Sequence, residues 1–184
     1  MTFALSGFSR MIISIKALLR GPRHFDFAFD SDWWRDRDAN DQVLGLDGPL
    51  NVQMTISKEE SNFVVEGRLS GGIRLRCDRC LGFYSHKLQP EFTLFLSSPP
   101  QDLDQNEIEL SEEDMAVRFI TGDEIDIDDI VIEQIYLSLP IKFLCSERCH
   151  GLCPICGTNL NRGKCDCQEE HGHPAFLKLK ELKH

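Results

Sequence analysis

Eight cysteines grouped in four close pairs constrain this chain more than any other feature of its sequence. The pairs are Cys77 with Cys80, Cys145 with Cys149, Cys153 with Cys156, and Cys165 with Cys167. Two sulfurs this close in sequence bind one ion from a tight turn, and two such pairs complete a tetrahedral site with four thiolate ligands. The sequence therefore predicts two zinc ions per chain, both in structural roles.

Three other interpretations of the cysteines remain open. Disulfides need an oxidising compartment, but no secretion signal is visible and close pairs are poorly suited to bridging each other. A redox role for Cys77 and Cys80, with Arg79 lowering a thiol pKa, lacks the βαβ context expected of a thioredoxin-like motif. The plainest alternative is that Cys77 and Cys80 are buried strand residues, because cysteine packs as a small hydrophobe.

Four pairs can combine into two sites in three ways. Only eight residues separate Cys156 from Cys165, so a site within the C-terminal segment closes a short loop at little entropic cost. This predicts a first site formed by Cys153, Cys156, Cys165 and Cys167. The second site then uses Cys77, Cys80, Cys145 and Cys149 and pins the C-terminal segment to a distant part of the chain. Spacing alone leaves the other pairings open.

Alternating apolar residues predict a sheet in residues 11–140. Period-2 patterns occur around residues 52–56, 63–69 and 73–77, and a longer one runs through residues 83–96. Apolar residues at helical spacing predict a helix over about residues 125–139, which Pro140 ends. We therefore expect an α+β fold: an antiparallel meander or barrel-like sheet packed by one or two helices, followed by a Cys-rich zinc-knuckle segment.

The remaining segments carry weaker signals. We expect residues 1–10 to form a disordered extension, residues 31–48 an irregular connection, and residues 99–124 an acidic loop. Residues 141–184 hold the zinc knuckles and end in a short helix over residues 175–183. Residues 1–24 are basic and free of acids, which also fits an organellar transit peptide, although a first strand after Met11 fits equally well. Without such a peptide, the expected location is the bacterial cytoplasm.

The net charge of −10 argues against general nucleic-acid binding, because affinity for the phosphate backbone comes from lysine and arginine. No apolar run approaches the length of a membrane span, so we expect no membrane partner. Contact with RNA must therefore use a local basic patch. The candidate residues are Arg68, Arg74, Arg76, Arg79, Lys87, Arg148, Arg162 and Lys164, with Lys142 and His150 nearby. The alternative is that these cations only balance the thiolates and keep the sheet edge solvated.

Several segments together resemble the YceD family of large ribosomal RNA subunit accumulation proteins. The shorter ones are Arg-His-Phe-Asp-Phe at residues 23–27, Cys-Asp-Arg-Cys-Leu at 77–81, Asp-Glu-Ile-Asp-Ile at 123–127 and Leu-Ser-Leu-Pro at 137–140. The longest covers residues 144–161 and is followed by Cys-Asp-Cys at 165–167. One departure is His-Pro-Ala at 173–175, where the family often carries Asp-Pro-Arg. Because some members lack the C-terminal cysteines, the resemblance implies that zinc stabilises the protein and is not its essential activity.

The resemblance implies a factor needed for synthesis, processing or stability of large-subunit (23S) ribosomal RNA. We expect a non-enzymatic assembly factor that binds this RNA or a basic ribosomal protein, with no small-molecule substrate. The acidic stretch, with Glu107, Glu109, Glu112 and Glu113, is either a solubilising loop or an RNA mimic that holds a basic ribosomal protein. No catalytic residue is identified, because none of the six histidines lies in a catalytic motif. The alternatives are an RNA-processing nuclease, a thiol-redox protein and a zinc-ribbon regulator.

Overall fold

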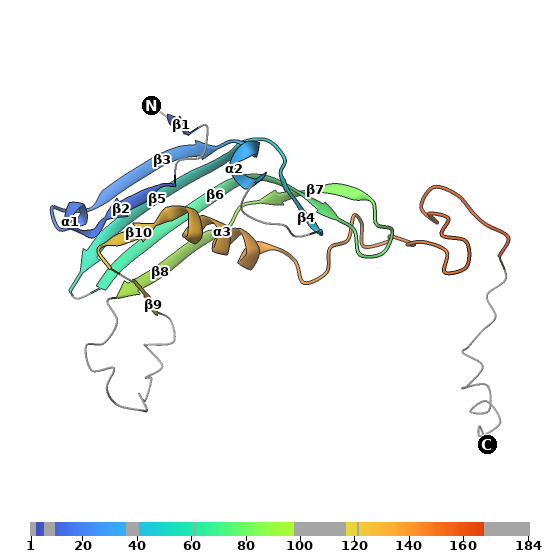
Figure 1. The fold of residues 1–184 in the computed structure, drawn as a ribbon. Helices are drawn as coiled ribbons and strands as arrows, with labels where there is room; N and C mark the ends of the chain where they lie inside the picture. The colour runs from blue at the N-terminus through green and yellow to red at the C-terminus, as the bar shows by residue number, and fades with distance from the viewer. Residues whose placement is uncertain are drawn as a thin grey trace, which may run out of the picture.

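A curved sheet covered on one face by a single longer helix forms the body of the protein (Figure 1). The computed structural model describes residues 3–5, 10–35, 41–60, 62–97, 117–120 and 122–167. Its strands are β1 (Phe3–Leu5), β2 (Ile12–Ser14), β3 (Arg23–Phe29), β4 (Val43–Leu46), β5 (Leu50–Glu59), β6 (Asn62–Arg76), β7 (Phe83–Leu88), β8 (Glu91–Ser97), β9 (Val117–Phe119) and β10 (Glu124–Asp126). Its helices are α1 (Ile15–Leu18), α2 (Ser31–Arg35) and α3 (Ile127–Ser138).

Strand β6 organises the sheet because its two halves pair with different neighbours. Its first half lies between β5 and β8, whereas its second half lies between β4 and β7. The main sheet runs in the order β1-β3-β5-β6-β8-β9, and a separate ribbon joins β2 to β10. Pairing is antiparallel except at the two edges, where β1 joins β3 and β9 joins β8 in parallel. The sheet is therefore open and mixed.

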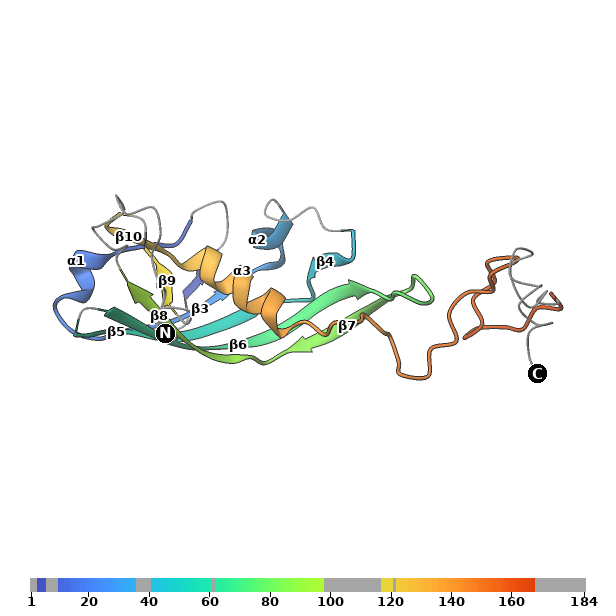
Figure 2. The ribbon, with the colours of Figure 1, turned by 90° about the horizontal axis from the view of Figure 1, so that it is seen from below.

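The core lies between the sheet and α3, as the two layers of Figure 2 show. On β5, Val52, Met54 and Ile56 are buried on the covered face, while Gln53 points to the opposite face. Helix α3 buries an apolar stripe against this sheet, formed by Ile127, Ile130, Val131 and Ile135. Burying one such side chain contributes roughly 1.5–3 kcal/mol, so this layer is a main source of stability.

The start of α3 is fixed by a side chain of the preceding strand. The carboxylate of Asp126 accepts hydrogen bonds from the backbone N–H of Asp128 at 3.0 Å and of Asp129 at 3.3 Å. This satisfies two amides that have no partner within the helix and contributes about 1 kcal/mol. The predicted helix over about residues 125–139 thus corresponds to α3.

The far half of β6 and its partner β7 extend beyond the end of α3 (Figures 1 and 2). Ile73 and Leu75 are fully buried there on the face that continues the core. Cys77 follows directly at the end of β6 and is also fully buried. The tip of this projecting hairpin meets the start of the cysteine-rich segment, which follows α3 in the chain and extends to the far end of the molecule in both views.

The structure confirms an α+β fold dominated by sheet, but the described strands do not close into a barrel. The predicted long strand over residues 83–96 is interrupted at residues 89–90, because Pro90 has no N–H to donate to the ladder. The two parts, β7 and β8, pair antiparallel with successive parts of β6 and keep the same register. Strand β1 falls inside the segment expected to be a disordered extension, and β9 inside the expected acidic loop. Residues 101–116 and the predicted helix over 175–183 lie outside the described residues.

The connection over residues 31–48 is more regular than its sequence indicates. It forms α2 and β4, and both tryptophans are buried. Trp33 stacks on Phe29 with 3.9 Å between the ring centroids, and Trp34 lies 6.0 Å from Tyr136 of α3. In the sequence, polar residues flank the two tryptophans, so the local pattern does not predict that their side chains are buried.

Gly67 should be intolerant of a side chain, because the ring of Phe92 on β8 lies directly over it. A Cβ added at Gly67 would lie 2.3 Å from Cζ of Phe92. Although alanine normally stabilises a strand interior relative to glycine, we expect Gly67→Ala to lower the free energy of unfolding by about 1–3 kcal/mol through overpacking. Urea unfolding measures this change. In a Phe92→Leu background the loss should shrink, and an equal loss in both backgrounds would rule out the steric explanation.

Candidate metal centres

The structure brings four cysteines together where the β6–β7 hairpin meets the segment after α3. This hairpin cluster consists of Cys77, Cys80, Cys145 and Cys149, whose sulfur atoms all lie within 4.8 Å of one another. The Sγ atoms of Cys77 and Cys149 are 3.8 Å apart, and those of Cys80 and Cys145 are 3.7 Å apart. The cluster therefore joins two chain segments 65 residues apart in sequence.

A tight turn directs Cys77 and Cys80 to the same point. The N–H of Cys77 donates to the carbonyl of Gly82 at 2.8 Å, and the N–H of Leu81 donates to the carbonyl of Cys77 at 2.9 Å. Leu81 has a φ of 56°, a left-handed conformation that costs energy for a residue with a side chain. The turn thus keeps an unfavourable backbone angle in order to bring the two sulfurs together.

Asp78 and Arg79, the two residues between these cysteines, hold the second pair in place. The N–H of Asp78 donates to the carbonyl of Phe143 at 2.7 Å, and its carboxylate accepts from the Phe143 N–H at 2.8 Å. The guanidinium of Arg79 donates to the carbonyl of Cys149 at 3.0 Å and to that of Glu147 at 3.3 Å. Both side chains therefore act on the backbone that carries Cys145 and Cys149.

The thiols of the hairpin cluster have opposed pKa shifts. Burial raises the pKa of Cys77, but the backbone N–H groups of Cys145, Cys80 and Arg79 outweigh this effect and lower it to about 6. Burial and the neighbouring Cys149 thiol raise the pKa of Cys145 to about 12. A metal ion bound here would hold all four sulfurs as thiolates.

A second cluster lies entirely within the C-terminal segment. This C-terminal cluster consists of Cys153, Cys156, Cys165 and Cys167, whose sulfurs also lie within 4.8 Å of one another. The N–H of Gly157 donates to the carbonyl of Cys153 at 2.9 Å, and Gly157 has a φ of 73°, which glycine adopts without strain. Hydrogen bonds from the hydroxyl and N–H of Thr158 lower the pKa of Cys156 to about 6.

Asn161 connects the two clusters. Although it lies in the loop between Cys156 and Cys165, its Nδ2 donates to the Sγ of Cys149 in the hairpin cluster at 3.3 Å. Its Oδ1 accepts from the backbone N–H of His150 at 2.8 Å. Burial raises the pKa of the Cys149 thiol. Hydrogen bonds outweigh burial and lower this pKa overall, and the largest contribution among them comes from Asn161.

The sulfur–sulfur distances in the hairpin cluster fit a tetrahedral metal ion. Zinc–sulfur bonds of about 2.3 Å place the sulfurs of a tetrahedral site about 3.8 Å apart, close to the 3.7 Å and 3.8 Å found in the hairpin cluster. The described part of the chain contains no other group of three or more histidine, cysteine or acidic side chains that could hold a metal ion in this way. The two sets of four that the sequence predicts are the two sets that lie together.

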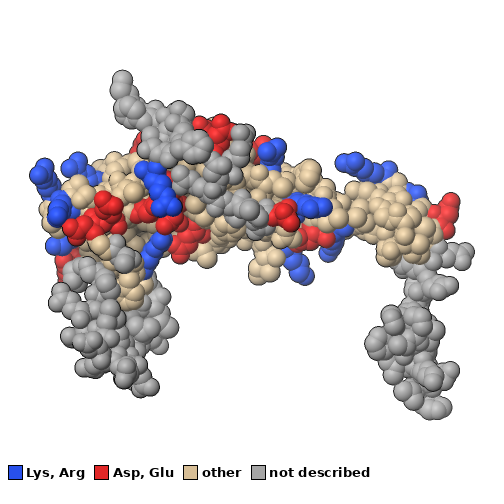
Figure 3. Space-filling view, in the orientation of Figure 1, with Lys and Arg blue, Asp and Glu red and all other residues tan. Residues whose placement is uncertain are grey.

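The eight basic residues singled out in the sequence do not form one surface. Arg68 lies in the middle of the sheet, 3.7 Å from Glu91, and Arg79 is bound to backbone carbonyls of the hairpin cluster. Arg74, Arg76 and Lys87 share the uncovered face of the β6–β7 hairpin. Arg148, Arg162 and Lys164 are exposed on the cysteine-rich segment. On the face that carries α3, basic and acidic side chains are interspersed (Figure 3), as in the pair of Arg118 and Glu133 at 2.7 Å.

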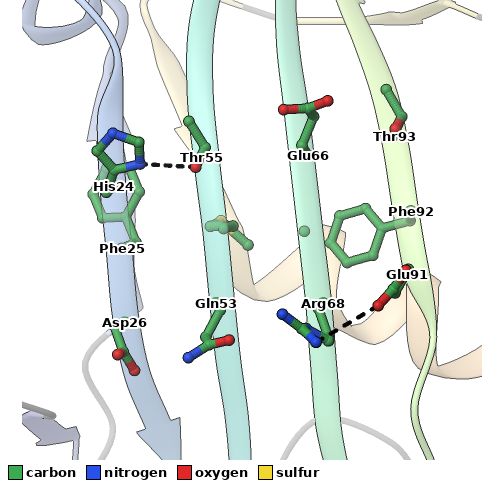
Figure 4. Close-up of a pocket in the computed structure, with 12 residues that line it drawn as sticks. His24, Phe25, Asp26, Gln53, Thr55, Glu66, Arg68, Glu91, Phe92 and Thr93 are labelled. Atoms are coloured by element: carbon green, nitrogen blue, oxygen red, sulfur yellow. Dashed lines mark hydrogen bonds and ion pairs between the residues drawn. The ribbon is translucent and has the colours of Figure 1, made fainter.

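The sequence did not indicate a groove on the uncovered face of the sheet (Figure 4). It has a volume of about 600 Å³ and is crossed by strands β3, β5, β6 and β8. His24 points toward Thr55, with 2.9 Å between Nδ1 and Oγ1. Glu66 and Asp26 line the same groove. Strand alternation predicts that these polar residues face outward, but only the pairing of the strands places them beside one another.

Comparison with known proteins identifies a family match. The family model described as large ribosomal RNA subunit accumulation protein YceD matches residues 65–183. A chloroplastic YCED homolog 1 from Arabidopsis thaliana is 24% identical over 168 residues, covering 80% of this chain and 52% of the relative. An uncharacterized protein from Mycobacterium bovis is 27% identical over 139 residues, covering 72% of this chain and 61% of the relative.

The relatives are longer than this chain, which limits what they indicate about it. A chloroplastic YCED homolog 2 from Arabidopsis thaliana is 28% identical over 120 residues, covering 61% of this chain and 52% of the relative. The chain thus spans little more than half the length of these relatives. No solved structure is significantly similar to it. Within the described residues, no helix is long and apolar enough to cross a membrane.

Removing the Asn161 amide should weaken metal retention at the hairpin cluster although Asn161 is not a ligand. Partners that hydrogen-bond to metal ligands typically contribute 10- to 100-fold to metal affinity, so we expect Asn161→Ala to release metal from the hairpin cluster about tenfold faster or more. A colorimetric chelator measures this release from protein loaded with metal. Asn51→Ala, a change of the same type on the outer face of β5, should leave the rate unchanged, and equal rates in both variants would exclude the link.

Proposed function

This chain belongs to the YceD family of large ribosomal RNA subunit accumulation proteins, and we propose that it acts as a non-enzymatic factor in the accumulation of large-subunit ribosomal RNA. Its role would lie in the synthesis, processing or stability of that RNA during assembly of the large ribosomal subunit. We propose that it works in the cytoplasm of a bacterium, or in an organelle if residues 1–24 act as a transit peptide. The direct partner would be the RNA itself or a basic ribosomal protein.

The observation that carries this proposal is the extent of the family match. Residues 65–183 include most of β6, the hairpin it forms with β7, helix α3 and all eight cysteines. The matched region thus includes the cysteines of both clusters together with the β6–β7 hairpin and α3. The named relatives that match are described as accumulation proteins for large-subunit ribosomal RNA, and a family match over this region supports a shared role.

We propose that the metal in both clusters is zinc. Four thiolates in tetrahedral arrangement suit zinc, and a closed set of four protein ligands leaves no position for a substrate or a reactive water. In the hairpin cluster, Cys77 and Cys149 are almost fully buried, which suits a structural site. Zinc would supply the cross-link that fixes the segment after α3 to the hairpin, and the surrounding surface would then meet the partner.

Two other surfaces bear on the partner. The basic residues on the cysteine-rich segment, Arg148, Arg162 and Lys164, are exposed and are candidates for contact with RNA. The acidic stretch with Glu107, Glu109, Glu112 and Glu113 is a candidate for holding a basic ribosomal protein, because clustered carboxylates attract a cationic partner. That stretch lies outside the described residues, so its support comes from its composition alone.

A nuclease is the alternative function, and the groove on the uncovered face is the observation that favours it. His24, Asp26 and Glu66 line this groove together, and a histidine with carboxylates is a set of groups that acid–base hydrolysis of RNA can use. The groove is shallow and crosses an open sheet. The two functions separate experimentally, because His24→Gln should abolish only the enzymatic one while leaving the fold intact.

Zinc content should fall in two independent steps when the clusters are removed one at a time. We expect two zinc ions per chain, and one after either Cys77→Ser with Cys80→Ser or Cys165→Ser with Cys167→Ser. The free energy of unfolding should fall by about 2 kcal/mol more in the variant that lacks Cys77 and Cys80 than in the variant that lacks Cys165 and Cys167. The reason is that the hairpin cluster closes a far longer loop than the C-terminal cluster. Elemental analysis and denaturant unfolding measure these changes. Loss of both ions in either variant would contradict two separate sites.

In cells, the protein should travel with precursors of the large ribosomal subunit. We expect it in the precursor fractions of a lysate gradient run at low magnesium, and we expect depletion of the protein to lower the amount of large-subunit ribosomal RNA relative to the small-subunit RNA. A protein found only at the top of the gradient would act before assembly. Unchanged RNA levels after depletion would contradict the proposed function.

A further inference from the structure

The uncovered face of the β6–β7 hairpin carries cations and an exposed aromatic ring side by side. Arg76 lies directly opposite Phe83 across the two strands, Arg74 opposite Ser85, and Gly72 opposite Lys87. Directly opposed residues in a sheet have their Cβ atoms about 4.5–5.5 Å apart. Arg74, Arg76, Phe83 and Lys87 therefore form one continuous area, here called the hairpin surface.

Phe83 is the large apolar residue of β7 whose side chain is exposed. It is 70% exposed, whereas Tyr84 and Leu88 of the same strand turn to the opposite face and pack against the core. A single exposed phenyl ring is common on protein surfaces. Its position beside Arg76 makes it informative, because the ring offers its apolar face where a positive charge is also available.

The cations of the hairpin surface are not neutralised by their neighbours. None of Arg74, Arg76 and Lys87 forms an ion pair with another described residue, in contrast to Arg68, which lies 3.7 Å from Glu91. The carboxylate of Asp78 accepts hydrogen bonds from Gln42 and from the Phe143 backbone. Asp47 borders the surface beside Gly72. The hydrogen bonds to Asp78 come from uncharged groups, so Asp78 keeps its negative charge, and three cations against the two acids leave the hairpin surface with a small net positive charge on an acidic protein.

We propose that the hairpin surface binds single-stranded RNA, with an unpaired base stacked on Phe83 and neighbouring phosphates held by Arg74, Arg76 and Lys87. An aromatic ring on an open sheet face can stack on a base only when that base is not already stacked in a duplex. The positive charge attracts the phosphate backbone, and it repels the basic ribosomal protein that is the other candidate partner. This inference rests on the proposed function and assigns RNA, not protein, to this surface.

The dimensions of the surface suit a short stretch of RNA. From Phe83 to Lys87 the strand advances four residues, or about 13 Å, which accommodates a few nucleotides. Arg76 is half-buried, and its Nε is enclosed without a hydrogen-bond partner among the described residues. This enclosure restrains the side chain, so less side-chain entropy is lost when its guanidinium meets a phosphate.

Binding of labelled oligonucleotides to the full-length protein tests the proposal. The probes are a fluorescein-labelled oligouridine of about 12 nucleotides and an RNA duplex of the same length, followed by fluorescence anisotropy over a salt series. We expect tighter binding of the single strand, with a slope of log affinity against log salt near −2, because three cations each contribute about −0.7. Phe83→Ala should weaken binding about five- to a hundredfold, and Phe83→Trp should restore it.

Matched variants on the same sheet separate this surface from the protein as a whole. Phe95, on β8, is 40% exposed and faces the same side, so Phe95→Ala should bind as the unchanged protein does. Arg74→Gln and Lys87→Gln should each reduce the salt slope by about 0.7, whereas Lys58→Gln, at the other end of the sheet, should not. Equal effects of Phe83→Ala and Phe95→Ala, or equal affinity for single strand and duplex, would overturn the proposal.

A cellular experiment separates failure of this inference from failure of the proposed function. If depletion lowers large-subunit RNA and Phe83→Ala protein still restores it fully, the RNA-binding inference is wrong while the function stands. If depletion has no effect on that RNA, the function itself fails. If the Phe83→Ala protein no longer sediments with the precursor fractions but still binds the oligouridine normally, the hairpin surface docks a protein. That result also overturns the inference.

Discussion

The pairing of strand β6 with four neighbours is the interaction on which the rest of the structure depends. Its first half builds the sheet that α3 covers, and its second half carries the hairpin away from that core. One continuous strand therefore connects the hydrophobic body to the cysteines. Because backbone hydrogen bonds run along all of β6, the position of Cys77 is determined by the same ladder that positions Val65 and Leu69 in the core. A change in register would turn every β6 side chain to the other face.

The hairpin cluster extends this order into a segment with little core of its own. Between α3 and Cys167 the chain has no regular helix or strand, and short stretches of this kind bury too little apolar surface to fold alone. The contacts of Asp78, Arg79 and Asn161 show how the segment is fixed instead, through backbone carbonyls, backbone amides and one sulfur. The cysteine sites thus replace hydrophobic packing, and the sheet provides the rigid base from which a surface can be presented.

On the uncovered face of the sheet, basic and acidic side chains are concentrated in different regions, so the net charge of the molecule does not describe its individual surfaces. The net charge of −10 conceals the positive hairpin surface, because acidic residues are concentrated elsewhere in the chain. On the uncovered side of the sheet, the central groove carries Asp26, Glu66 and Glu91, whereas the hairpin carries Arg74, Arg76 and Lys87. A partner that approaches this side meets acidic side chains over the central groove and basic side chains over the hairpin, which favours one orientation over the other.

The sequence by itself determined the cysteine sites, the alternating strands and helix α3, because each depends on local spacing or periodicity. It also paired Cys77 and Cys80 with Cys145 and Cys149 as a hypothesis, which the proximity of the sulfurs supports. It missed the burial of Trp33 and Trp34 and the parallel edge strands. It also grouped Arg68 and Arg79 with Arg74, although the first two have partners of their own. These features were decided by tertiary structure alone, because which strands become neighbours and which charges meet depends on contacts between residues far apart in the chain.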